Sequence, residues 1–337
     1  MKSTHRPCLR LHTLVLAFGL VLAASAPAFA QRILIYPLEQ EKGSDSTRWI
    51  GTGLAVGLDE TLSLNRLPNV PYEELQAYYR QEGLVGSPEF SLSALTGLAR
   101  QLGAGILVTG EYRVEDERMA VRLEVLDLSE DPKSLGNWEE REVLGNLLLM
   151  TRRLSRRLHE VIGRRVAENP PAVSPGAFES YIRGRIAEDP TLQEVYLRGA
   201  LEIEPGYDNA RCQLAEVLKA AGEFQESREL LEQLEPQTYP KAYKGLLLLA
   251  QFRMTEGDFP EARRLLLASL EAREGAEAHI ELARLYLNER KPEEASRELA
   301  VAEQFGTMQE EIEGLKEAIR QEAEKAEPEA AESAGES

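Results

Sequence analysis

The glycine pattern Gly51-x-Gly53-x-x-x-Gly57 could form a nucleotide-binding loop. Glu73 or Glu74 follows near the distance at which such loops place a ribose ligand. That fingerprint, however, needs its glycines in a tight turn directly after a strand, and here the first predicted strand ends well before them. The glycines also fall within a helical leucine stripe. The sequence therefore favours close helix packing over nucleotide binding, and we expect no cofactor.

Histidine usage gives no support for a metal site. His159-Glu160 begins like the zinc-protease helix motif, but Gly163 stands where the second histidine is required. Only His159 and His279 follow residue 30, too few to form a histidine metal site by themselves. The sequence contains neither a phosphate loop with its lysine nor a G-x-S-x-G nucleophile elbow. We therefore predict that the protein is not an enzyme and holds no metal.

Residues 1–30 have the three parts of a secretory signal. They begin with basic residues, continue with an apolar run from Leu14 to Ala24, and end in Ala28-Phe29-Ala30, which fits an A-x-A cleavage site. The apolar run is shorter than the ~20 residues needed to span a bilayer. We expect cleavage after Ala30 and a periplasmic mature chain that begins at Gln31.

Removal of this segment would leave one cysteine and a more acidic chain. Cys8 departs with it, and Cys212 then lies on an amphipathic helix, where a free cysteine ordinarily packs as a small apolar residue. An intermolecular disulfide is the alternative. The net charge of −18 becomes −21, because three basic residues and no acid are lost. Such a charge argues against nucleic acid as a partner, since that binding depends on basic side chains.

One helix-turn-helix pattern occurs three times between Asp208 and Gly306, with a period of 33 to 35 residues. A small residue follows leucine in the first helix of each copy, at Ala215, Ala250 and Ala283. Gly222 and Gly257 follow the first two of these helices, where a left-handed residue is favoured. The third copy departs from the pattern, because it has Arg290 in place of glycine and Pro292 in place of an aromatic residue. A weaker upstream copy, which includes Tyr181, is interpreted as an amino-terminal cap.

These spacings resemble the tetratricopeptide repeat (TPR). The resemblance implies an all-α solenoid over 177–321, with about four repeats and a capping helix, that binds a protein or peptide. In such folds the first helix of each repeat lines a concave groove. By residue-wise analogy the partner-binding groove would present Tyr181, Arg185, Cys212, Glu216, Lys219, Leu247, Gln251, Met254, Ile280, Arg284 and Leu287.

Residues 31–166 predict a small α/β domain with helices packed on a mixed sheet. A buried strand at 32–37 precedes two helices with leucine stripes, over 50–62 and 92–102. A hairpin over 106–125 and a closing helix over 144–166 complete it. The fold class is thus α+β, with this domain preceding the solenoid.

The segments Ile33-Leu34-Ile35-Tyr36-Pro37-Leu38 and Leu102-Gly103-Ala104, together with Gly53-Leu54 and Trp138, resemble the TolB amino-terminal type of domain. That resemblance implies a non-catalytic assembly or sensory module. Three prolines mark 167–176 as a linker. The tail over 322–337 is rich in Glu and Ala and has no aromatic or β-branched residue, so we expect it to be disordered and acidic.

An arginine cluster on the closing helix stands out from the acidic background. It could hold anionic headgroups or an acidic partner at the envelope. Alternatively, the arginines are solvated, favoured near a helix carboxyl end, or paired with the protein's own acidic repeats. The cluster comprises Arg152, Arg153, Arg156, Arg157, Arg164 and Arg165.

Two functions follow from this organisation. The leading hypothesis is a non-enzymatic adaptor or scaffold of the bacterial cell envelope that binds a partner segment in the TPR groove. The alternative is a structural, oligomerising component of an outer-membrane-associated assembly. Native mass would separate them, because the assembly predicts a stable ring or filament. The identity of the partner cannot be read from the residues.

Overall fold

The computed structural model describes residues 32–65, 67–84, 90–165, 173–234, 243–305 and 308–335, with side chains as far as residue 322. The predicted signal segment and residues 167–172 of the predicted linker lie outside these ranges. Within the ranges, no helix combines the length and apolar character needed to cross a membrane.

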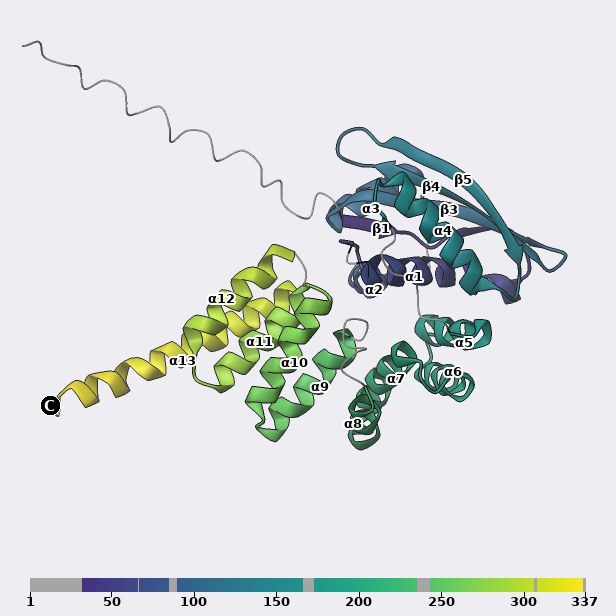
Figure 1. Cartoon of the computed structure of the whole chain (residues 1–337). Helices are drawn as coiled ribbons and strands as arrows, with labels where there is room; N and C mark the ends of the chain where they lie inside the picture. Colours follow the sequence, from purple (N-terminus) through teal and green to yellow (C-terminus); the bar gives the residue numbers. More distant parts are fainter. Residues whose placement is uncertain are drawn as a thin grey trace, which may run out of the picture.

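A mixed five-stranded sheet forms the first part of the molecule (Figure 1). Its order is β1-β3-β4-β5, and β2 also pairs with β3. β1 and β2 run parallel to β3, whereas β3, β4 and β5 are antiparallel. The hairpin turns at Asp116 and Glu117, both with positive φ. The strands are β1 Arg32–Ile35, β2 Glu39–Lys42, β3 Ala104–Glu115, β4 Arg118–Asp127 and β5 Lys133–Val143.

Helices cover both faces of this sheet. On one face α1 (Trp49–Leu64) and α4 (Leu147–Val161) pack against inward residues such as Val121 and Leu123. On the other face lie α2 (Tyr72–Gln81) and α3 (Leu92–Gln101). The predicted first strand, leucine-striped helices, hairpin and closing helix are all present, although the closing helix is shorter at both ends than predicted.

Three elements were not predicted: β2, α2 and β5. β5 is an edge strand with the sequence KSLGNWEEREV, in which charged residues outnumber apolar ones and only half-buried Trp138 packs against the main core. α2 reads YEELQAYYRQ, and among its residues only Leu75 and Tyr79 are buried. Such elements carry a weak hydrophobic period, because they contribute few side chains to the core.

Four helix pairs and a final helix form the solenoid, which continues from the α/β part to the carboxyl end (Figure 1). Ala215, Ala250 and Ala283 are fully buried, as the repeat pattern predicts. Gly222 and Gly257 have positive φ, and Arg290 adopts the same backbone conformation at φ 56° in the third copy. The helices are α5 Pro175–Ile186, α6 Pro190–Ile203, α7 Asp208–Ala221, α8 Phe224–Glu232, α9 Tyr243–Glu256, α10 Phe259–Ala272, α11 Ala276–Asn288, α12 Pro292–Ala302 and α13 Gln309–Gly335.

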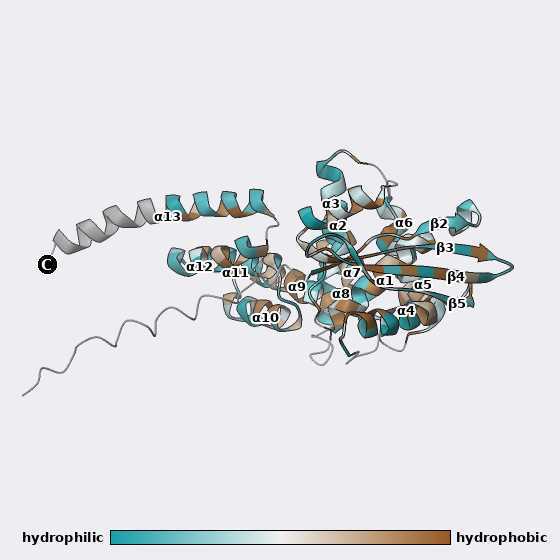
Figure 2. Ribbon diagram, turned by 90° about the horizontal axis from the view of Figure 1, so that it is seen from above, coloured by the Kyte–Doolittle hydropathy of each residue, from teal (hydrophilic) through white to brown (hydrophobic). Residues whose placement is uncertain are grey.

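The carboxyl-terminal helix corrects one expectation. α13 extends to Gly335, so the backbone is helical over 322–335, where disorder was predicted. Glu, Ala and Lys dominate this stretch, and all three have high helix propensity even where no core is available. Upstream, Ile312 and Ile319 are buried with α11 and α12, and Figure 2 shows α13 lying beside them.

The α/β part and the first repeats share one core. A single cluster of buried residues runs from the sheet through α1 to Phe178 and Ile182 on α5 and on to Leu214 of α7. α5 begins at Pro175, inside the predicted linker, because Ser174 caps it by accepting a hydrogen bond from the Ala177 N–H. The first repeat is therefore fixed against the sheet's helices.

Candidate functional site

Gly53 and Gly57 of α1 allow close contact between α1 and α5. A methyl group added at Gly53 would lie 2.8 Å from Ile182 Cγ2, and one at Gly57 would lie 3.1 Å from Phe178 Cζ. Both glycines are inside α1. They therefore do not form a strand-to-helix turn, and their small size allows the first repeat to pack closely.

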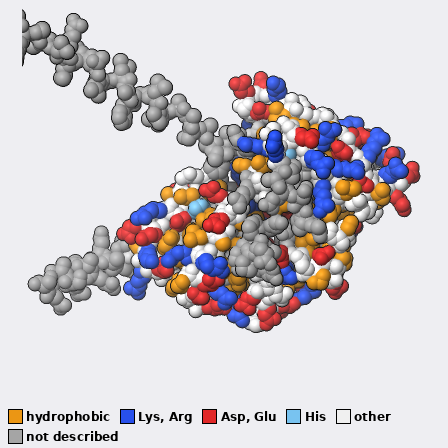
Figure 3. Space-filling model, viewed as in Figure 1, with side chains coloured by type: hydrophobic (Ala, Val, Ile, Leu, Met, Phe, Trp, Pro, Cys, Tyr) orange, Lys and Arg blue, Asp and Glu red, His pale blue; other side chains and the backbone are white. Residues whose placement is uncertain are grey.

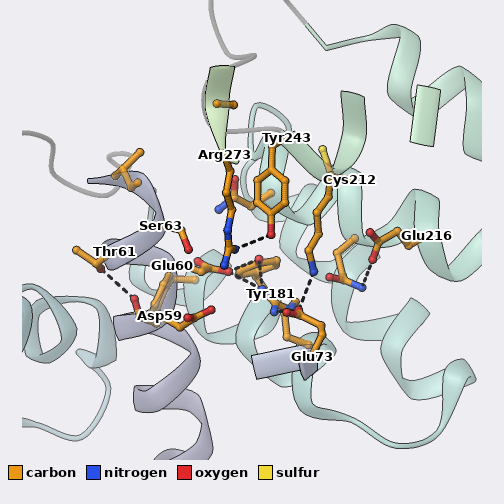
Figure 4. A pocket seen from close by; sticks show the side chains of 18 of the residues that line it. Asp59, Glu60, Thr61, Ser63, Glu73, Tyr181, Cys212, Glu216, Tyr243 and Arg273 are labelled. Atoms are coloured by element: carbon orange, nitrogen blue, oxygen red, sulfur yellow. Dashed lines mark hydrogen bonds and ion pairs between the residues drawn. The ribbon is translucent and has the colours of Figure 1, made fainter. Parts of the chain in front are cut away.

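A cavity lies where α1 and α2 face the concave side of the first repeats (Figure 4). The empty volume of the cavity is about 970 Å³, and this volume includes the solvent space at its opening. Residues from α1, α2, α4, α5, α7, α9 and α10 line it, together with Tyr243 and Lys244 at the start of α9 and Arg273 just after α10. The charged lining residues are Asp59, Glu60, Glu73, Arg185, Glu216, Lys244 and Arg273.

Arg185 joins the two parts of the molecule across this cavity. Its side chain is 8% exposed, and its Nη1 lies 2.8 Å from Glu60 Oε1. Nη2 pairs with Glu73, and Nη1 also donates to the Tyr181 hydroxyl at 3.0 Å. The Tyr181 hydroxyl in turn donates to Glu60. One guanidinium from α5 thus neutralises a carboxylate from each of α1 and α2.

Lys244 is the second cation in this network. Its Nζ lies 2.9 Å from Glu73 Oε1, and the side chain is 21% exposed. Burial by itself would raise the pKa of Glu73, but Arg185 and Lys244 outweigh it and hold the pKa below its usual range. Burial raises the pKa of Glu60, against the opposing effect of Arg185.

Arg273 and Asp59 also line the cavity, and Asn69 connects their side chains by hydrogen bonds. Arg273 donates to the Tyr243 hydroxyl at 2.8 Å and to Asn69 Oδ1 at 3.2 Å, and its guanidinium lies over the Tyr243 ring. Asn69 also donates to Asp59, which is 6% exposed. Burial raises the pKa of Asp59 from its ordinary 3.8 to about 6, although Arg273 opposes the shift.

We expect Asp59→Asn to stabilise the protein in a pH-dependent way. Because the folded-state pKa is raised, ionised Asp59 weakens folding above pH 6, and the penalty disappears as the pH falls below the unfolded value. A change from 3.8 to about 6 corresponds to about 3 kcal/mol at most. Chemical denaturation between pH 4 and pH 8 should show the largest gain above pH 6.

Asp127→Asn is the opposite-sign control for this experiment. Asp127 accepts a hydrogen bond from the Ser129 N–H, which lowers its pKa, so neutralising it should destabilise the protein at neutral pH. A gain at Asp59 that does not change with pH would contradict the assignment.

The predicted groove residues divide into three groups. Tyr181, Cys212 and Ile280 are buried, and Tyr181 and Cys212 also contribute to the lining of the cavity. Cys212 lies against Gly245 of α9, and burial raises the pKa of its thiol. Arg185 and Glu216 line the cavity. Six residues remain half-buried on α7, α9 and α11, and they are Lys219, Leu247, Gln251, Met254, Arg284 and Leu287.

A polar chain joins three of these positions, Lys219, Gln251 and Arg284, because both Gln251 and Arg284 contact Glu281. Lys219 Nζ contacts Gln251 Oε1, and Gln251 Nε2 donates to Glu281 Oε1 at 2.9 Å. Arg284 Nη2 lies 2.7 Å from Glu311 Oε1 on α13. Side chains of α7, α9 and α11 therefore lie on one continuous surface, with α1 and α2 at one end and α13 at the other.

The arginine cluster is partly neutralised by the neighbouring strand. Arg153 lies 3.3 Å from Glu142, and Arg157 lies 3.7 Å from Glu140, both on β5. Arg156, Arg164 and Arg165 are exposed. Figure 3 shows basic side chains gathered over the α/β part of the molecule. Arg153 and Arg157 thus pair with acids of β5, whereas the expectation had named the acidic repeats.

His159 and His279, the histidines in the described part of the chain, are buried, and each contacts an acceptor. His159 Nδ1 is 2.7 Å from the Ser155 carbonyl oxygen, and His279 Nδ1 is 2.7 Å from Glu298 Oε2. In the part of the chain that the structure describes, no three His, Cys, Asp or Glu side chains are grouped as metal ligands would be.

The helix-turn-helix pairs and the buried alanines at their crossings are the features of a known repeat family. Residues 194–247 match the tetratricopeptide repeat family. The match runs from α6 to the start of α9 and so includes the whole of the α7–α8 pair. TPR units are ordinarily modules for protein–protein interaction and are not catalytic.

Two further comparisons concern curated proteins and solved structures. No curated protein matches this chain. The C-terminal domain of LpoB from Salmonella enterica is similar to part of it, at 12% identity and a TM-score of 0.26, over 34% of this chain and 83% of that domain. A TM-score of this size does not establish a shared fold.

Sequence reasoning did not identify several cavity residues. Asp59, Glu60, Lys244 and Arg273 were not singled out, and Glu73 was considered only as a ribose ligand. Glu73 binds Arg185 and Lys244 instead. No local spacing marks these residues, because their partners come from other helices.

Proposed function

We propose that the protein is a non-enzymatic adaptor that binds a partner segment in the surface formed by α7, α9 and α11. We call this surface the open groove and define it by Lys219, Leu247, Gln251, Met254, Arg284 and Leu287. The observation that carries the proposal is the continuity of these half-buried side chains over three successive first helices. Leu247 and Met254 give it apolar contacts, and its polar chain gives hydrogen-bonding groups.

The α/β part has a different role in this proposal. Its helices α1 and α2 pack against α5, the first helix of the first repeat, so the open groove begins at α7. Its resemblance to TolB amino-terminal-type domains supports an assembly or docking role. Mixed apolar and polar surfaces of this kind suit protein partners.

Met254→Glu should weaken partner binding by about tenfold, since it places a charge in the centre of the open groove. Leu267→Glu is the matched control, because Leu267 is 49% exposed on α10, the second helix of the same repeat. The partner is first captured from periplasm and identified by mass spectrometry, and its affinity is then measured with purified proteins. Equal binding by two folded variants would rule out the open groove.

We also propose that the protein works in the periplasm. The basic start, short apolar run and A-x-A pattern of residues 1–30 support export. Amino-terminal sequencing of the protein recovered from cells should begin at Gln31. Recovery of an intact residue 1 on a membrane-bound form would overturn both the cleavage site and the location.

A further inference from the structure

The cavity beside the open groove carries an unequal number of acids and bases. Among the described residues that line it, Arg185, Lys244 and Arg273 face four carboxylates. Arg185 and Lys244 are ion-paired with Glu60 and Glu73. Arg273 acts electrostatically on Asp59. The fourth carboxylate, Glu216, forms no ion pair among the described residues, and its hydrogen bond comes from a neutral side chain.

Glu216 stands where the cavity meets the open groove. It lies on α7 one turn before Lys219, so the two side chains follow each other on one helix face. Its hydrogen-bond partner is the neutral amide of Gln213, with Nε2 donating to Oε2 at 3.0 Å. Three cations act on Glu216 without forming an ion pair with it: Lys244 and Arg185, which Glu73 already holds, and Lys219. The nearby acids are Glu73 and Glu277.

We propose that this cavity takes a lysine or arginine side chain of the partner, with Glu216 as its ion-pair acceptor. The inference rests on the proposed function, because it names the residue that a segment in the open groove would insert. Phe178, Tyr243 and Leu64 supply apolar wall for the aliphatic stem of such a side chain. An anionic side chain would add a second uncompensated negative charge at the same place.

The test uses single blocked amino acids and therefore needs no identified partner. Nα-acetyl-lysine amide and Nα-acetyl-arginine amide are titrated into the full-length mature protein by NMR, beside the neutral norleucine and anionic glutamate amides. The cationic probes should perturb resonances of the cavity and bind about tenfold more tightly than norleucine amide. Equal binding of lysine and norleucine amides, or tighter binding of glutamate amide, would overturn the proposal.

A pair of variants locates the site. Glu216→Gln should weaken binding of the lysine probe by about tenfold, through loss of one charge-assisted hydrogen bond. Glu229→Gln removes the same charge from the exposed surface of α8 and should leave binding unchanged. Unchanged binding by Glu216→Gln would overturn the assignment. If Glu216→Gln also retains the purified partner while Met254→Glu loses it, only the cavity proposal fails and the open groove stands.

Discussion

Arg185→Met is expected to destabilise the folded protein by about 3 to 5 kcal/mol, the usual cost of removing one member of a buried ion-pair network. Its guanidinium is 8% exposed and bridges Glu60 and Glu73. Methionine fills similar volume but leaves Glu60 without its cation and Glu73 with Lys244 alone, in a low-dielectric interface where an unpaired charge is costly. Urea denaturation monitored by circular dichroism measures the change in the free energy of unfolding.

Arg198→Met is the matched control, because Arg198 also bridges two glutamates. It lies 2.8 Å from each of Glu194 and Glu226, but its side chain is 40% exposed. Exposed pairs contribute about 1 kcal/mol or less. Adding Glu60→Gln to Arg185→Met should recover part of the loss, since Arg185 is the ion-pair partner of Glu60. Equal losses for Arg185→Met and Arg198→Met would show that burial does not set the cost.

The repeat architecture could be predicted because its signals are local. Ala215, Ala250 and Ala283 recur with the helix pairs, and each is small because two helices cross there. Even the irregular third turn keeps the expected conformation, with Arg290 at positive φ. The α/β core could be predicted in outline for a similar reason, since its buried strands and leucine-striped helices have clear periods.

The cavity could not be predicted, because it depends on contacts between distant parts of the chain. Arg185 is 125 residues from Glu60 and 112 residues from Glu73. Glutamate and arginine are abundant on helices, so nothing in the sequence distinguishes this set from solvated charges. The packing of α5 on α1 brings these residues together and also buries Tyr181, whereas Cys212 is buried against α9; the repeat register alone would place both in a groove.

Gly51→Ala tests whether the position of α1 depends on close approach of its backbone to the chain after β1. A methyl group at Gly51 would fall on the Leu38 carbonyl oxygen, well inside van der Waals contact, and lie 2.9 Å from Tyr112 Cε1. The obstacle is backbone, which cannot rotate away as a flexible side chain can. We expect a loss of about 3 kcal/mol, at the upper end of the range for overpacked cores.

Gly97→Ala should have the opposite effect and serves as the control. Gly97 lies inside α3, and a methyl group there would have no neighbour within 4 Å. Alanine in a helix is favoured over glycine by about 0.5 to 1 kcal/mol, so this variant should be more stable than the parent. If denaturation shows that both substitutions raise stability, helix propensity decides the glycine positions. Opposite shifts would mean that position 51 must be glycine because α1 lies close to the chain after β1. That contact also fixes the position of α1, which carries Asp59 and Glu60.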